Sequence, residues 1–195
     1  MISEYEAAES LRQVQSVGQR THLLRAYGEA SPHLLLAGTV WIIGYIGMAI
    51  SKPEQWGLIW LPLTIIVLVG SFAIALRLGR SKAPNPAPWI TSVAAVTYAA
   101  RVLWGIGATM IFIVLTYLLF RPAELLPYIV FPAFLLAFVY ALAGSLGATR
   151  FAWIGAGVFV LTEVGLLVAP HLIAYFIAAG GGGGLILGGF WLRRA

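Results

Sequence analysis

The sequence predicts an all-α fold: a polytopic membrane protein with a bundle of six transmembrane helices and an N-terminal amphipathic helix on the cytoplasmic side. Of the 195 residues, 61% are hydrophobic and 10% are charged, whereas soluble domains have roughly 45–50% and about 25%. The apolar residues form long uncharged runs, each long enough to cross a bilayer. These runs cover 30–51, 55–76, 102–120, 125–149 and, interrupted only by Glu163, 151–192.

Residues 1–31 are predicted to form the N-terminal helix. Ser3 and Glu6 fit the spacing of a capping box, and apolar residues recur at helical intervals over 11–24. The segment carries acidic and basic residues and lacks an apolar central region, so we do not expect a signal peptide. Its apolar face is expected to lie on the membrane or a partner, or to pack beneath the bundle.

Residues 32–195 are predicted to form the transmembrane domain. Ser31 suits the N-cap of the first span, and Pro32 suits its first helical position. The six spans are expected at 33–50, 57–76, 101–120, 125–146, 152–169 and 171–192. The turns between most of them are short, which leaves no room for a soluble catalytic domain.

Basic residues predict the orientation of the bundle. Of the 12 Lys and Arg residues, all but Lys52 and Arg121 lie on the side that carries both termini. Because basic residues are retained in the cytoplasm, we expect both termini there. The chain is therefore expected to be a multi-pass protein of a bacterial cytoplasmic (inner) membrane, with the lipid bilayer as a partner.

The connection before the third span permits two interpretations. Residues 89–100 are apolar but too few to cross a bilayer, so they either form an interfacial helix or lengthen the third span. A helix from Ile90 to Phe120 exceeds a normal span, which favours the first interpretation and makes Arg101 a cytoplasmic anchor. In the second interpretation Arg101 lies at the depth of Glu163, and the two side chains can pair.

Glu163 is the main candidate for a functional site, because it is the acidic residue predicted deep inside a span. An ionised carboxylate in an apolar span is costly unless it is paired or protonated, so Glu163 and its neighbour Thr162 are expected to face the bundle interior. There the carboxylate could carry a proton, coordinate a cation or bind an amine, with Arg101 as its possible partner. The alternative is a structural hydrogen bond to a neighbouring helix.

Glycines dominate the sixth predicted span. They form one run of five and a further pair, at Gly180, Gly181, Gly182, Gly183 and Gly184 and at Gly188 and Gly189. Gly180, Gly184 and Gly188 form two overlapping G-x-x-x-G pairs, which predict close helix packing or a homo-oligomer contact. The alternative is a broken helix that exposes backbone carbonyls to a cavity, as in transporters with discontinuous helices.

A weak internal repeat is compatible with three related helical hairpins. It consists of tryptophans followed by glycine in the odd spans and prolines early in the even spans, at Trp41, Trp104 and Trp153 and at Pro62, Pro127 and Pro170. Tryptophan and proline are also common at membrane interfaces and in first helical turns, which explains the pattern without a repeat.

The composition argues against an enzyme and against a bound metal or other cofactor. The chain has no cysteine, and all seven acidic residues are glutamates, which excludes thiolate chemistry and Asp-rich magnesium clusters. Ser145 and His171 are predicted at opposite membrane faces, too far apart for a catalytic dyad. His22, His33 and His171 are expected at interfaces. The net charge of +5 arises at membrane edges, so no nucleic-acid partner is expected.

Two classes of function remain open. One is a small permease, channel or intramembrane small-ligand binder whose path passes Glu163 and is shaped by the glycine run. The other is a non-transporting subunit, sensor or assembly partner that acts through residues 1–31 and the small-residue helix faces. A hydrated cavity favours the first class, which we prefer, and a dry, closed core favours the second. The sequence identifies no substrate.

Overall fold

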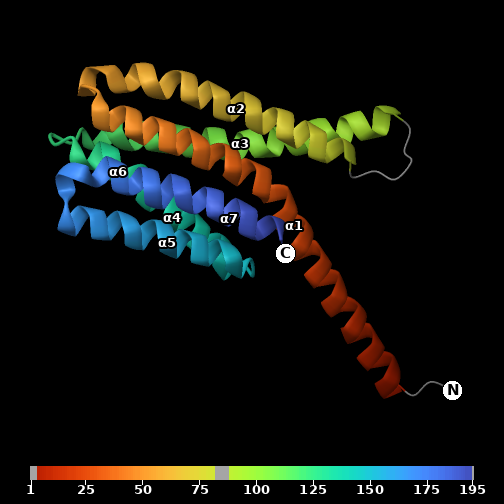
Figure 1. The fold of residues 1–195 in the computed structure, drawn as a ribbon. Coiled ribbons are helices and arrows are strands. Elements are labelled where there is room, and N and C mark those ends of the chain that lie inside the picture. Colours follow the sequence, from red (N-terminus) through yellow and green to blue (C-terminus); the bar gives the residue numbers. More distant parts are fainter. Residues whose placement is uncertain (1–3, 82–87, 195) are drawn as a thin grey trace.

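The computed structural model describes residues 4–81 and 88–194, and every regular element in these ranges is helical (Figure 1). The long helices are α1 (Glu4–Ile50), α2 (Trp56–Ser81), α3 (Pro88–Phe120), α4 (Leu126–Ser145) and α5 (Thr149–Val168). The last apolar stretch comprises α6 (Ile173–Ile177), the π-helix η3 (Ala178–Gly183) and α7 (Gly184–Arg193). Two short 3-10 turns, η1 (Pro53–Gln55) and η2 (Pro170–Leu172), precede α2 and α6.

Within the described residues, six stretches are long and apolar enough to cross a membrane, which confirms the predicted all-α six-helix bundle. They are Leu23–Ile50, Pro53–Gly79, Val96–Phe120, Leu126–Ser145, Thr149–Val168 and Pro170–Arg193. We call the end of the bundle where the first stretch begins and the last one finishes the terminal end. The opposite end, which holds the connections after Ile50, Phe120 and Val168, is the turn end.

α1 is one continuous helix, so the prediction that Ser31 caps a new helix is wrong. The helix continues through Pro32, and the buried hydroxyl of Ser31 donates a hydrogen bond to the carbonyl oxygen of Gly189 at 2.8 Å. Contact with α7 thus keeps α1 helical where the local sequence favours a boundary. The N-terminal part of α1 leaves the bundle and extends away from it (Figure 1). Ser3 of the predicted capping box lies outside the described residues.

Residues 88–100 lengthen the third helix, so the predicted start of its span at Arg101 is too late. α3 begins at Pro88, and its apolar stretch begins at Val96. α2 likewise continues to Ser81, beyond its predicted end, and the two helices pack side by side (Figure 1). The contact between α2 and α3 stabilises the last turns of α2 and the first turns of α3. Membrane thickness alone would place these residues in the connection between the two spans.

α1 is the central helix of the bundle. It packs on α2 and also on α6, η3 and α7, while α4 packs on α5. α3 packs mainly on α2, although α4 follows it in the chain. Because α3 packs on α2 and α4 packs on α5, a seam remains between α3 and α4. The packing therefore does not follow the three helical hairpins of the suggested repeat.

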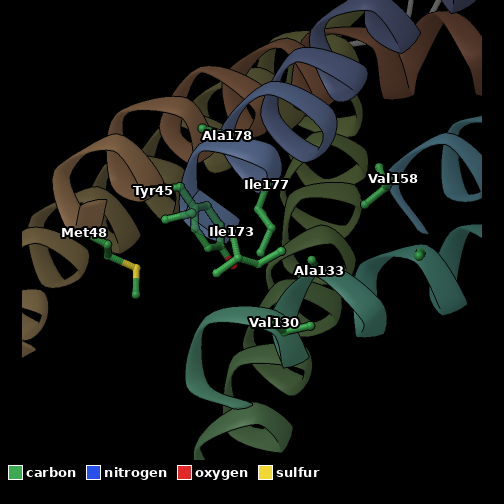
Figure 2. Packing of buried hydrophobic residues seen from close by; sticks show 10 residues of the cluster. Tyr45, Met48, Val130, Ala133, Val158, Ile173, Ile177 and Ala178 are labelled. Atoms are coloured by element: carbon green, nitrogen blue, oxygen red, sulfur yellow. The ribbon is translucent and has the colours of Figure 1, made fainter. Parts of the chain in front are cut away.

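The largest cluster of buried side chains lies toward the turn end and joins α1, α4 and α6 (Figure 2). Tyr45 is only 1% exposed, and its hydroxyl donates a hydrogen bond to the carbonyl oxygen of Ile129 at 3.0 Å. Its ring meets Trp60 nearly at a right angle, with centroids 5.4 Å apart. Ile173 and Ile177 of α6 lie beside Tyr45 (Figure 2), so one aromatic side chain connects three helices.

The glycine run does not break the sixth span but widens it into η3. Glycines also allow α1 and η3 to approach closely. A Cβ at Gly38 would lie 2.6 Å from the carbonyl oxygen of Gly182, and a Cβ at Gly182 would lie 2.9 Å from the carbonyl oxygen of Gly38. No side chain fits between these backbones, so the two helices meet along their main chains, as small residues permit in membrane bundles.

Candidate functional site

A cavity of about 560 Å³ lies among α1, α2, α3 and α4, and we call it the α1–α4 cavity. Its polar lining comes from all four helices: His33, Thr64, Ser71, Arg101, Thr109 and Tyr140. Apolar side chains, including Trp41, Trp60 and Met110, cover much of the rest. Small-molecule sites have volumes of roughly 300–1,000 Å³, so the cavity is large enough for a small organic ligand.

Aromatic side chains close the α3–α4 seam at the turn end. Tyr117 packs on Tyr128 and Phe131, with ring centroids 4.6 Å and 5.7 Å away, and its hydroxyl donates a hydrogen bond to the carbonyl oxygen of Tyr128 at 3.0 Å. Phe112 also contacts Phe131. The cavity lies on the terminal side of these rings, where Gly105 of α3 places no side chain in the seam.

The charged group of the cavity and the hydroxyl group of Tyr140 lie toward the terminal end. Arg101 and Tyr140 lie about five residues from that end of their apolar stretches, roughly 8 Å of helix rise. Trp41 and Trp60 lie in the halves of their stretches nearer the turn end. The cavity therefore carries its charge near one predicted membrane edge, and its middle combines apolar side chains with the hydroxyl groups of Thr64 and Thr109.

Arg101 is the one charged side chain among the described residues that line the cavity. It is exposed, and it forms neither a hydrogen bond nor an ion pair with any residue that the structure describes. In particular, the alternative in which Arg101 pairs with Glu163 does not occur. Its guanidinium therefore keeps its planar set of N–H donors available to a ligand.

The imidazole of His33 is the second unusual group in the lining. Both ring nitrogens are buried, and neither has a hydrogen-bond partner in the described part of the chain. Leaving a buried polar group unpaired costs about 1–3 kcal/mol. Such a group calls for an explanation, for example a water molecule or another partner that completes its hydrogen bonds.

A further polar contact lies on the terminal side of the cavity. The side chains of Glu29 on α1 and Tyr98 on α3 are hydrogen-bonded. Glu29 lies one helical turn before His33, and Tyr98 lies one turn before Arg101. This contact links α1 to α3 next to the polar end of the cavity.

Glu163 lies outside this cavity. It belongs to α5, which contributes no lining residue, and it forms no hydrogen bond or ion pair within residues 4–81 and 88–194. Thr162 is fully buried, and its hydroxyl oxygen has no hydrogen-bond partner in the same ranges. The functional role that the sequence suggests for Glu163 and Thr162 stays a prediction.

Replacing Glu163 by glutamine is expected to leave the fold intact and to raise the melting temperature slightly. A carboxylate without a described partner on a membrane helix costs free energy, and an amide removes the charge. The measurement is thermal unfolding of the purified chain in detergent, followed by tryptophan fluorescence. Glu54→Gln, at an exposed site of the turn end, is the control. A fall of several degrees for Glu163→Gln alone would show that Glu163 makes a stabilising interaction.

The glycines of the G-x-x-x-G pairs face α5 of the same chain. A Cβ at Gly180 would lie 2.5 Å from the Cβ of Leu161, and a Cβ at Gly188 would lie 2.7 Å from Cδ1 of Ile154. Gly184 lies between them on the same face and has more room. These glycines bring two helices of one protomer together, and a homo-oligomer contact through them stays a prediction.

Ser145 and His171 lie far apart, at opposite ends of the bundle. Ser145 is the last residue of α4, where its hydroxyl donates a hydrogen bond to the carbonyl oxygen of Leu142 at 2.7 Å. His171 lies in η2, beyond the 20 residues of α5, which is roughly 30 Å of helix. No group of three His, Cys, Asp or Glu in the described ranges could hold a metal ion.

The sequence offered little sign of this cavity apart from Arg101. The sequence predicts His33 at an interface, but α1 is continuous and His33 lies inside a stretch that begins at Leu23. Ser71 and Tyr140 lie in mostly apolar stretches of α2 and α4, and no sequence motif singles them out.

No protein-family model matches the chain, and no curated protein or solved structure matches it.

Proposed function

We propose that the protein is an intramembrane small-ligand binder of the permease type and that the α1–α4 cavity is its ligand chamber. The observation that carries the proposal is a cavity of about 560 Å³ whose lining includes Arg101, a charged residue without a partner among the described residues. A bundle that served only as a scaffold would be more stable with this space filled. It would also avoid an unpaired charge within a span, where ionisable residues usually mark functional sites.

We propose binding rather than catalysis. A nucleophilic enzyme needs a nucleophile and a base in hydrogen-bond contact, and the ring nitrogens of His33 have no hydrogen-bond partner in the described ranges. On this proposal the ligand meets Arg101, not Glu163, because Glu163 does not line the chamber.

We further propose that the polar end of the chamber faces the cytoplasm of a bacterial cell. Among the described residues, the basic residues other than Lys52 and Arg121 lie on the terminal side of the bundle, and such residues are retained on the cytoplasmic side of a membrane. The ligand would then enter from the cytoplasm or from the cytoplasmic leaflet.

The second candidate is a non-transporting subunit or sensor that binds a partner through α1. The observation that favours it is the N-terminal part of α1, which extends away from the bundle (Figure 1). This candidate requires no water inside the bundle, so the two proposals differ in the hydration of the α1–α4 cavity.

Gly105→Cys is expected to react with a charged methanethiosulfonate reagent in intact membranes, whereas Gly107→Cys is not. The chain has no cysteine, so each variant carries a single thiol. A Cβ at either position meets no other atom within 4 Å, but only Gly105 lines the cavity. Both lie well inside the stretch Val96–Phe120. Because the reactive thiolate form needs water, the rates should differ by roughly tenfold or more.

The matched positions make the labelling result decisive. Both variants should first show the same thermal unfolding profile, which confirms that each one is folded. Equally slow labelling of both thiols would indicate that the α1–α4 cavity contains no water. This result would contradict the proposed ligand chamber and would favour the subunit or sensor function.

A further inference from the structure

We propose that the α1–α4 cavity binds an amphipathic organic anion, with its anionic head at Arg101 and its apolar tail directed toward Trp41 and Trp60. This inference rests on the proposed chamber and names the class of its ligand. The head is a carboxylate or a comparable oxyanion, and the tail is an alkyl chain or an aromatic body.

The charge of the lining selects an anion. Arg101 is basic, and no aspartate or glutamate is among the described residues that line the cavity. A guanidinium binds a carboxylate through two parallel hydrogen bonds, which are strong because both groups are charged. Ser71 and Tyr140 add hydroxyl groups near the same end of the cavity. A cationic ligand would meet a positive charge, and the neighbouring carboxylate of Glu29 does not line the cavity and is hydrogen-bonded to Tyr98.

The order of side chains along the cavity selects an amphipathic ligand. Arg101 and Tyr140 lie near the terminal end of their apolar stretches, whereas Met110 and Pro132 lie deeper. The charge therefore lies at one end of the cavity, and the deeper lining is mainly apolar. Thr64 and Thr109 are the polar side chains described there, and the hydroxyl of Thr109 already donates a hydrogen bond to the carbonyl oxygen of Gly105 at 2.9 Å. An amphiphile embedded in a leaflet has the same order, with its head near the interface and its tail toward the middle of the bilayer.

The seam between α3 and α4 offers such a ligand a lateral route. The ring contacts between these helices lie at the turn end, where Tyr117 packs on Tyr128. On the terminal side, Met110 of α3 and Val139 of α4 both line the cavity, yet they are 38% and 42% exposed. These two side chains therefore border both the cavity and the outer surface of the bundle, which the lipid would cover.

Photolabelling of the full chain in phosphatidylcholine vesicles tests the ligand class. One probe is a long-chain fatty acid with a diazirine on its tail, and a second is a water-soluble benzoate with a diazirine. Each acid is compared with the corresponding uncharged alcohol. We expect an acid to label residues that line the cavity more strongly than its alcohol does, and we expect the tail diazirine of the fatty acid to react near Trp41, Trp60 and Met110. Labelling by the fatty acid assigns the ligand to the membrane, and labelling by the benzoate alone assigns it to the aqueous phase.

Arg101→Gln should reduce labelling by the acid about tenfold, because it removes a charge-assisted hydrogen-bonded pair. Arg77→Gln is the matched control, since Arg77 is exposed at the same end of the bundle but does not line the cavity. Arg101→Lys keeps the charge but loses the planar fork, and it should reduce labelling less than glutamine does. This second variant keeps the test valid if Arg101→Gln does not fold.

The proposal of an anionic ligand would be wrong if acids and alcohols label the chain equally. It would also be wrong if neither Arg101→Gln nor Arg101→Lys changes the labelling by the acid. The chamber would still stand if Gly105→Cys is reactive and Gly107→Cys is not. If both thiols are unreactive, the chamber itself fails, so the two failures can be told apart.

Discussion

Replacing Gly38 by alanine is expected to destabilise the folded protein by about 2–3 kcal/mol, which corresponds to a fall in melting temperature of roughly 5–10 °C. The new methyl group would lie 2.6 Å from the carbonyl oxygen of Gly182 and 2.8 Å from Cγ1 of Ile186. The first of these contacts is with backbone, which cannot rotate away, so α1 and η3 would have to separate. Thermal unfolding in detergent, followed by tryptophan fluorescence, measures the loss.

Gly28→Ala is the matched control for this substitution. It also lies in α1, but a Cβ there meets no atom within 4 Å. Alanine is favoured over glycine inside a helix by roughly 0.5–1 kcal/mol, so this variant should be as stable as the parent chain or slightly more so. If Gly38→Ala unfolds at the same temperature as Gly28→Ala, the close contact between α1 and η3 is wrong.

Replacing Tyr45 by alanine is expected to cost about 3–5 kcal/mol, the largest effect predicted for this protein. The side chain is almost fully buried, contacts Trp60 and donates a hydrogen bond to the carbonyl oxygen of Ile129. Removing it leaves a hole where α1, α4 and α6 meet (Figure 2). The unfolding free energy can be measured by titration with a denaturing detergent.

Two further substitutions separate the contributions of Tyr45. Tyr45→Phe keeps the ring and loses only the hydrogen bond, so we expect a cost of about 1 kcal/mol. Tyr175→Ala removes a tyrosine that is 43% exposed, and its effect should be clearly smaller than that of Tyr45→Ala. Equal losses for Tyr45→Ala and Tyr175→Ala would contradict the assignment of Tyr45 to the core.

The sequence predicted the number of spans well, because that property depends on local composition. A stretch of about 20 uncharged residues is stable in lipid only as a helix whose backbone groups are all paired. Boundaries were less certain where a neighbouring helix supplies the contacts. α3 begins at Pro88 because it packs along α2, and α1 continues through Pro32 because Ser31 is hydrogen-bonded to Gly189.

In the candidate site, too, some features follow from the local sequence and others depend on neighbouring helices. The sequence singles out Arg101 as a charge near a span, but it permits two positions for this residue along the membrane normal. The sequence does not single out His33 and Tyr140, because isolated histidine and tyrosine residues are ordinary at a membrane interface or in a core. Their importance depends on the side chains that surround them, which come from other helices.

By itself, the sequence determined the all-α membrane class, the six apolar stretches and the one-sided distribution of basic residues, since each depends on the cost of placing nearby groups in lipid. Only the tertiary structure decided which helices are neighbours. With α3 on α2 and α4 on α5, Arg101 and His33 line one cavity while Glu163 stays outside it. Helix pairing depends on how the surfaces of distant segments fit together, for example where Gly38 meets Gly182, and no local pattern reports that fit.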